Sequence, residues 1–173
     1  AITGGIARSM TDIMPLARRT TPKHDFAEFV EGLRAVIAEA GEKPDCLSFS
    51  IAGVVDPDTQ ALTCANIPCI HGRRLAADLE AELGHPVLIA NDADCFAMAE
   101  AMSGAGRGHR IVFGAILGTG VGGGLVADGP LLNAAGGLAG ERGHGPIIAS
   151  PARDPPGAIP AHPCGRLHIR VGA

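Results

Sequence analysis

FGAILGTGVGGGLV, residues 113–126, decides the interpretation of the fold, because an apolar run breaks into five glycines within seven residues and then resumes. This pattern predicts a strand, a glycine loop and a second strand. Glycine permits positive φ and places no Cβ between its amide and a ligand, so successive N–H groups of the loop are suited to holding a phosphate. Asp128-Gly129 follows and favours a tight turn.

Two other phosphate motifs fit this stretch less well. Gly118, Gly120 and Gly123 satisfy the dinucleotide pattern GxGxxG, but that pattern needs a helix directly after its glycines, and a strand is expected here. A P-loop is excluded because the chain has no Gly-Lys-Ser/Thr run. Thr119 adds a hydroxyl that can bond the same oxygens. The plainer alternative is a glycine-rich hairpin that only turns the chain.

The composition excludes some classes of partner. The 173 residues suffice for one ordinary domain, or for one lobe and part of another. Five Phe with no Trp or Tyr predict an aliphatic core and leave few platforms for stacking single-stranded nucleic acid. A net charge of −4 does not indicate the basic surface that binding to nucleic acid or to an anionic membrane requires. We therefore expect neither as a partner.

The cysteines and the start of the chain predict a cytoplasmic protein. The five cysteines include no CxxC pair, which favours reduced thiols over a disulfide framework. The sequence shows no signal peptide and no apolar run of the roughly 18 residues that a membrane span requires. Because Ala1 is not an initiator methionine, we expect a truncated start.

Helical and strand patterns alternate along the first two thirds of the chain. Asp25 and Glu28 form a capping box before an amphipathic helix that Gly41 stops. Two more helices are expected, one carrying leucines at 75, 79 and 83 and one over residues 93–102. Buried strands are expected at 46–52 and 86–90. This order predicts an α/β layer with parallel strands, to which the glycine hairpin adds an antiparallel pair.

Asn91-Asp92 stands where the second buried strand ends and a helix begins. In open α/β sheets, ligands bind outside the carboxyl ends of the strands. The functional hypothesis makes Asp92 a general base that accepts a substrate hydroxyl proton, with Asn91 bonding a neighbouring hydroxyl. The structural alternative is that Asp92 is the N-cap of the helix.

Weaker candidates lie in other loops. Gly53 and Asn66 offer backbone or short polar groups suited to sugar hydroxyls, although a lone loop Asn is more often a turn former. Glu141 and His144 stand three apart among glycines, where they could bond vicinal hydroxyls or, for His144, a metal. Cys164 lies between two downstream histidines, but without the close cysteine pairs of structural zinc sites the spacing argues against zinc.

Three segments together resemble the ROK family of bacterial sugar kinases, within the actin-like ATPase superfamily. They are NDA at 91–93, LGTGVGGG at 117–124 and GLAGERGH at 137–144, in the order in which that family has them. The resemblance implies an α/β fold of actin-like (ribonuclease H-like) lobes, each a mixed sheet with flanking helices. It divides the chain into a sugar-kinase lobe at 1–108 and the start of a nucleotide-binding lobe at 109–173.

The resemblance also implies ATP and Mg²⁺ as cofactors, a sugar and a nucleotide as small-molecule partners, and a homodimer. Asp92 is similar to the family's catalytic base. The residues that resemble sugar contacts are Gly53, Asn66, Asn91, Glu141 and His144, and those that resemble the second phosphate loop are Gly118, Thr119, Gly120, Gly122 and Gly123. His144 with Cys164 would then belong to a structural zinc site.

The chain departs from the family pattern in three places. The first phosphate motif, an Asp followed by two glycines and a threonine, is expected just before Ala1; Ala52 replaces a usual proline; and the zinc-binding cysteine run is reduced to Cys164. We therefore expect truncation at both ends. The predicted activity is phosphorylation of the primary hydroxyl of a hexose or N-acetylhexosamine, with N-acetylglucosamine favoured by residues 91–96. Alternatives are a fructokinase or glucokinase, or an inactive sugar-sensing regulator of the same family.

Overall fold

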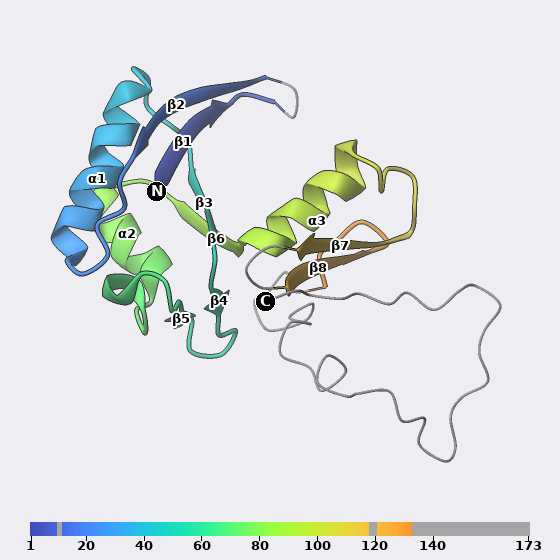
Figure 1. The fold of residues 1–173 in the computed structure, drawn as a ribbon. Coiled ribbons are helices and arrows are strands. Elements are labelled where there is room, and N and C mark those ends of the chain that lie inside the picture. The colour runs from blue at the N-terminus through green and yellow to red at the C-terminus, as the bar shows by residue number, and fades with distance from the viewer. Residues whose placement is uncertain (10–11, 118–120, 133–173) are drawn as a thin grey trace, which may run out of the picture. The chain divides into compact units, whose positions relative to one another are not determined.

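The computed structural model of the protein describes residues 1–9, 12–117 and 121–132. The described elements all fall within one compact unit, Ala1–Gly143. In chain order they are β1 (Ile2–Ala7), β2 (Ile13–Arg19), α1 (Phe26–Glu39), β3 (Leu47–Ile51), β4 (Val54–Val55), β5 (Leu62–Thr63), the short 3₁₀ helix η1 (Pro68–Ile70), α2 (Leu75–Leu83), β6 (Val87–Asn91), α3 (Asp92–Ser103), β7 (Ile111–Leu117) and β8 (Val121–Ala127) (Figure 1). The predicted lobe boundary at residue 108 stays a prediction.

The strands of the described part pair two by two. β3 and β6 are parallel, in register from Leu47 opposite Val87 to Ile51 opposite Asn91, which confirms the predicted parallel pair. β1 with β2, β4 with β5, and β7 with β8 are antiparallel. The mixed α/β class expected from the sequence is therefore observed, and the glycine-rich segment is a hairpin.

The ends of α1 and α2 follow the local sequence signals. Asp25 caps α1, because its Oδ1 accepts from the Glu28 backbone N–H at 2.9 Å. Gly84 ends α2 with φ of 69°, a left-handed conformation that glycine adopts without steric cost. Asp128 and Gly129 also take positive φ, at 53° and 106°, in the tight turn that follows β8.

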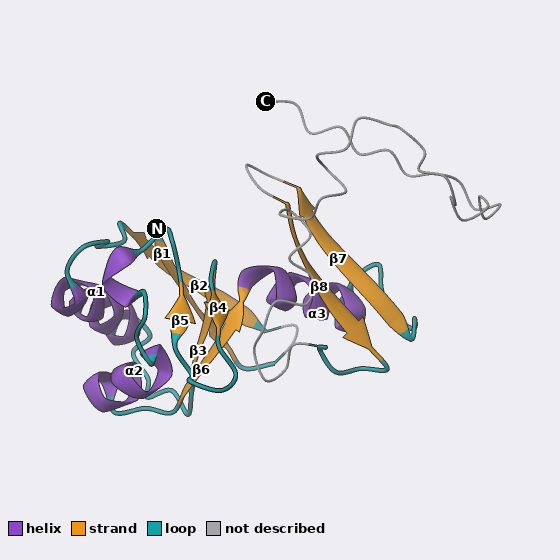
Figure 2. Cartoon of the chain, turned by 90° about the horizontal axis from the view of Figure 1, so that it is seen from below, coloured by secondary structure: helices purple, strands orange, loops and turns teal. Residues whose placement is uncertain are grey.

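Large apolar side chains fill the core against which α1 and α2 pack. Both helices lie on the same side of the β3–β6 pair (Figure 2). Ile70 and Leu79 are fully buried. The buried core cluster is Phe29, Val30, Leu33, Leu62, Cys64, Ile70, Leu75, Leu79 and Val87. This core holds the strand ends that carry the candidate site.

The β1–β2 hairpin packs against α1 through glycine. A Cβ built at Gly4 would overlap the Val36 side chain of α1, so a larger residue there would separate the strand from the helix. Helix α3 belongs with the other hairpin, because it packs chiefly against β7 and β8. Within the described residues, no helix is long and apolar enough to span a membrane.

Candidate functional site

The candidate site is built at the junction of β6 and α3. Asn91 is the last residue of β6 and Asp92 the first of α3. The Asn91 Oδ1 accepts from the backbone N–H groups of Ala93 at 2.8 Å and Asp94 at 3.3 Å. Asn91 is therefore the N-cap of α3, so the structural alternative, which gave this role to Asp92, was wrong. The cap leaves the neighbouring carboxylate in the first helical turn.

The Asn91 amide also ties this junction to the adjacent strand end. Its Nδ2 donates to the Gly53 carbonyl oxygen at 3.0 Å, across the carboxyl ends of β3 and β6. A Cβ at Gly53 would lie 2.8 Å from the Thr63 carbonyl oxygen, which is closer than side chains tolerate. Both ends of the Asn91 amide thus bond backbone, and the loop after β3 is fixed relative to the start of α3.

Asp92 presents an exposed carboxylate at this edge. Its Oδ1 accepts from the Ala93 backbone N–H at 3.0 Å. Among the described residues, no hydrogen bond to its Oδ2 is formed. The partial positive charge at a helix N-terminus favours an anion there. The arrangement therefore offers an exposed carboxylate with one oxygen bonded to the helix backbone, which suits a group that receives a proton from a ligand.

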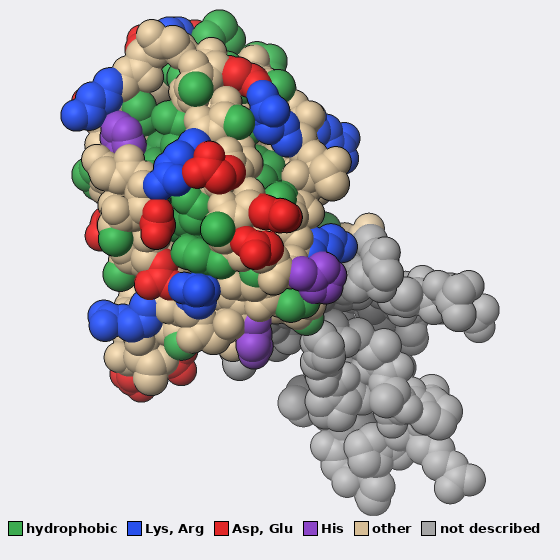
Figure 3. Space-filling model, turned by 90° about the vertical axis from the view of Figure 1, so that its left-hand side faces the viewer, with side chains coloured by type: hydrophobic (Ala, Val, Ile, Leu, Met, Phe, Trp, Pro, Cys, Tyr) green, Lys and Arg blue, Asp and Glu red, His purple; other side chains and the backbone are tan. Residues whose placement is uncertain are grey.

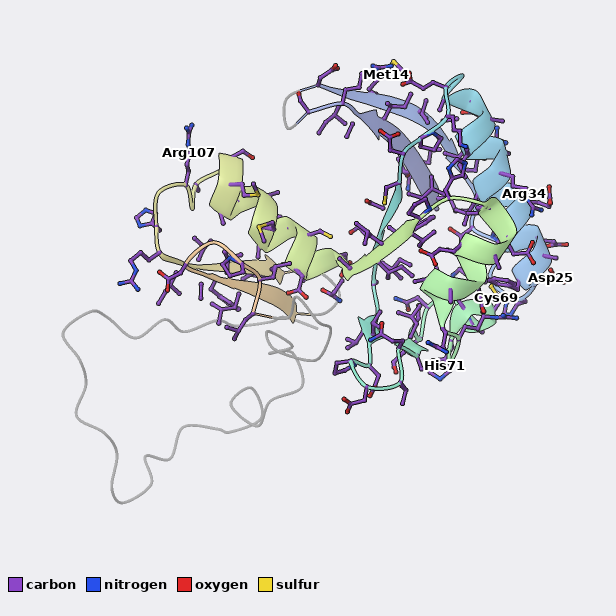
Figure 4. All side chains as sticks on the ribbon, turned by 180° about the vertical axis from the view of Figure 1, so that it is seen from behind. Met14, Asp25, Arg34, Cys69, His71 and Arg107 are labelled. Carbon is purple, nitrogen blue, oxygen red and sulfur yellow. The ribbon has the colours of Figure 1, made fainter. Side chains whose placement is uncertain are left out.

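Asn66 lies on a different loop, between β5 and η1, and is exposed. The base of this loop is closed by the His71 Nδ1, which accepts from the Cys64 backbone N–H at 3.2 Å, and by the Gly72 N–H, which donates to the Leu62 carbonyl at 2.8 Å. His71 and its loop are visible in Figure 4. Asn66 thus lies in a segment whose two ends are joined by hydrogen bonds.

Cys69 lies in η1 and is partly buried. Burial raises the pKa of its thiol, and it lies near Asp25 (Figure 4). Its backbone N–H donates to the Lys23 carbonyl at 2.9 Å. Since the thiolate is the nucleophilic form, a raised pKa makes Cys69 a poor nucleophile. The residue serves to fasten η1 to the segment before α1.

The glycine motif is divided by the structure. Gly118, Thr119 and Gly120 lie outside the described residues, whereas Gly122 and Gly123 lie within β8, opposite Ile116 and Ala115. The last two are therefore strand residues rather than loop residues. Their role in nucleotide binding stays a prediction, as does that of the loop itself.

The remaining predicted residues are Glu141, His144 and Cys164, and all three lie outside the described residues. In the part that the structure describes, there is no group of three or more His, Cys, Asp or Glu that could hold a metal ion. The zinc hypothesis therefore continues to rest on the sequence. Of the predicted set, the structure brings together Gly53, Asn91 and Asp92.

Sequence reasoning missed two glycines on which α3 packs closely. Gly114 of β7 and Gly124 of β8 are opposite each other and face Ala93 and Ala97 of α3. Ala93 and Ala97 are buried, at 3% and 0% exposure. The sequence contains a signal for this contact. Alanines four apart lie on the same face of a helix, and glycines at paired positions of a hairpin leave a surface without side chains on which that face can pack.

A cavity of about 760 Å³ lies elsewhere, between β1, α1 and the start of β3. None of Gly53, Asn66, Asn91 or Asp92 lines it. The cavity is therefore not part of the candidate site. On the face drawn in Figure 3, basic and acidic side chains are interspersed, so no field of one sign covers it.

Comparisons with known proteins agree on one family. The family model described as "ROK family" matches residues 2–166. The N-acetylgalactosamine kinase AgaK of Shewanella sp. (strain ANA-3) is 42% identical over 142 residues, which are 78% of this chain and 44% of the relative. An N-acetyl-D-glucosamine kinase of Photobacterium profundum is 40% identical over 130 residues, 73% of this chain and 43% of the relative.

A solved structure extends the likeness to the fold. The ROK family glucokinase from Streptomyces griseus, in complex with glucose and AMPPNP, matches with a TM-score of 0.70 at 31% identity. The match covers 82% of this chain and 46% of the glucokinase. The chain thus spans about half the length of the proteins that it matches.

Proposed function

The chain belongs to the ROK family, and from that premise we propose that the protein phosphorylates the primary hydroxyl of an N-acetylhexosamine with ATP. The observation that carries the proposal is the exposed Asp92 carboxylate at the carboxyl end of the parallel strand β6, beside the Gly53 loop. Strand ends of this kind hold ligands in α/β folds. The Shewanella and Photobacterium relatives are both named as kinases of N-acetylated amino sugars.

In the proposed reaction Asp92 is the general base. As the sugar hydroxyl oxygen forms its bond to the γ-phosphorus, the bond between that phosphorus and the leaving oxygen of ADP breaks. The hydroxyl proton passes to the Asp92 carboxylate. Phosphoryl transfer depends mainly on the positions of the reactants, so the Asn91 tether contributes by fixing the helix turn that carries the base. Mg²⁺, when bound, would neutralise charge on the phosphates.

Other predicted residues complete the proposal. Gly118, Thr119 and Gly120, together with Gly122 and Gly123 of β8, would hold the nucleotide phosphates. The sugar would be contacted by Gly53, Asn66, Asn91, Glu141 and His144. A homodimer and a zinc site at His144 and Cys164 belong to the same proposal by analogy with the family, and a cytoplasmic location belongs to it because of the cysteine pattern.

The preferred sugar within the proposal is N-acetylglucosamine. N-acetylgalactosamine is the second candidate, because the Shewanella relative, the more identical of the two, carries that name. The two sugars differ only in configuration at C4, so a few hydrogen bonds decide between them. Glucose is a third candidate, since the matched glucokinase structure contains it.

The experiment is an ADP-release assay on the protein made from its full reading frame, with both N-acetylhexosamines, glucose, mannose and fructose. We expect the highest kcat/KM with an N-acetylhexosamine and a phosphate on its primary hydroxyl by ³¹P NMR. If no sugar stimulates ADP release, the kinase proposal is wrong. A sugar-dependent rise in melting temperature without turnover would favour the sugar-sensing regulator. A ligand present at 100 times its Kd raises the free energy of unfolding by about 2.7 kcal/mol, so sugar binding would be detected in this way.

A further inference from the structure

We infer that Gly124 is a positioning residue for the base Asp92, because its lack of a side chain lets the first turn of α3 lie directly on β8. The inference rests on the proposed function, in which Asp92 receives the proton. It assigns to the glycine run a second task besides phosphate binding. Gly114, opposite Gly124 on β7, shares that task.

The contact is between backbones. A Cβ at Gly124 would lie 2.7 Å from the Ala93 carbonyl oxygen and 2.8 Å from the Asp94 Cα. Both are main-chain atoms of the first turn of α3, so they cannot rotate away as the end of a long side chain would. A Cβ at Gly114 would lie 2.8 Å from the Ala97 Cα, one turn further along.

A methyl group at Gly124 would therefore displace the helix. Ordinary van der Waals contact begins at 3.4 Å, and 3.4 minus 2.7 leaves about 0.7 Å for the Ala93 oxygen to retreat. Ala93 follows Asp92 directly, and the Asn91 amide holds the same turn to Gly53 on its other flank. A shift at Ala93 is thus transmitted to the carboxylate. Misplacement of a reacting group by about 1 Å can cost 10²-fold in rate.

The neighbouring glycine of the same strand behaves differently. Gly122 faces the same helix, but a Cβ there has the Ala93 Cβ, at 3.6 Å, as its contact among the described residues. That is ordinary van der Waals distance. Packing on α3 therefore requires glycine at 124 and leaves room for a methyl group at 122.

The test is a double-mutant cycle in the full-length protein, made of Gly124→Ala, Asp92→Asn and both together. We expect Gly124→Ala to lower kcat by about tenfold or more. In the Asp92→Asn background it should cause less than about a twofold further loss, since residues that act through one another are not additive. Gly32→Ala is the matched control, because a Cβ at Gly32 meets the flexible end of Ile2 at 3.2 Å and should leave kcat unchanged.

The outcomes separate this inference from the proposed function. An unchanged kcat in Gly124→Ala, or an equal loss in both backgrounds, overturns the positioning role and leaves the kinase intact. Absence of sugar phosphorylation in the unsubstituted protein overturns both. If Gly124→Ala does not fold, Ala97→Gly replaces it in the double-mutant cycle. This substitution removes the buried methyl group between the two glycines without a clash. The loss of kcat that it causes should again disappear in the Asp92→Asn background.

Discussion

The core beneath α1 and α2 and the contact of α3 with the β7–β8 hairpin are packed in opposite ways. Large side chains such as Leu79, with 0% exposure, fill the first. In the second, glycines at 114 and 124 bring two backbones together around the small residue Ala97. A core filled by side chains is weakened when atoms are removed, whereas a contact between backbones is weakened when atoms are added.

This difference has a functional meaning. Asn91 ends a strand of the side-chain core, and Asp92 begins the helix that rests on glycine. Direct contact between backbones leaves few rotamers to vary, so it fixes the position of the helix turn more tightly than flexible side chains would. The candidate base thus lies at the start of the helix that makes this contact between backbones.

The largest effect on stability is expected from removing atoms in the side-chain core. Leu79→Ala should lower the free energy of unfolding by about 2–5 kcal/mol, through lost burial and the cavity left behind. Urea denaturation measures it. Leu88→Ala is the control, because Leu88 is 64% exposed, and its effect should stay within about 0.5 kcal/mol. Equal losses for the two leucines would refute the assignment of the core.

The second-largest loss of stability is expected from adding atoms at the contact between α3 and the β7–β8 hairpin. Ala97→Val should cost about 1–3 kcal/mol by overpacking against Gly114 and Gly124. Ala99→Val, on the exposed side of the same helix, carries only the propensity cost of roughly 0.5 kcal/mol. Thermal denaturation of both variants gives the difference. A similar loss at both positions would mean that the α3–hairpin contact is not tight.

A smaller effect is expected at the start of α1. Asp25→Ala removes the acceptor for the Glu28 N–H and should cost about 1 kcal/mol. Asp25→Asn retains an acceptor oxygen and should recover most of that loss. Urea denaturation at neutral pH compares the three proteins. An undiminished stability in the alanine variant would show that the cap contributes nothing.

The smallest effect concerns the exposed ion pair of Arg19 and Glu39. The hydrogen bond from Arg19 lowers the pKa of the Glu39 carboxyl from its ordinary value. A lowered folded-state pKa gives stability that is present above the unfolded value and lost as pH falls through the folded one. Glu39→Gln should therefore lower the melting temperature slightly at neutral pH and not at strongly acidic pH. A loss that is the same at both pH values would contradict this.

Much of the fold follows from local sequence signals. The capping box at Asp25 and the terminal Gly84 correctly predict where α1 begins and α2 ends. The apolar runs correctly predict the places of β3 and β6, but the expectation that both strands are buried was wrong: β3 alternates half-buried and exposed residues, and Leu88 of β6 is 64% exposed. The β1–β2 hairpin was not recognised as a pair, since Gly4 and Gly5 interrupt the alternation of β1 and Pro15 weakens the strand signal of β2.

The site is less predictable than the fold. Asn91 and Asp92 are both good N-caps, and their order in the chain does not decide which one caps. The structure shows that Asn91 caps, since its Oδ1 accepts from the Ala93 and Asp94 backbone N–H groups. Its Nδ2 bonds the Gly53 carbonyl, 38 residues away in the chain. The role of Gly124 likewise depends on which face of β8 meets α3. The roles of Asn91 and Gly124 therefore follow from contacts in the folded structure and not from residue type alone.

The most direct test of the account is Asp92→Asn in the full-length protein, with turnover and sugar binding measured separately. If Asp92 is the base at the start of α3, kcat should fall by roughly 10²- to 10⁴-fold, while the Kd for the sugar, measured by calorimetry, stays close to that of the unsubstituted protein. An undiminished kcat would contradict the central claim and remove Asp92 from the reaction.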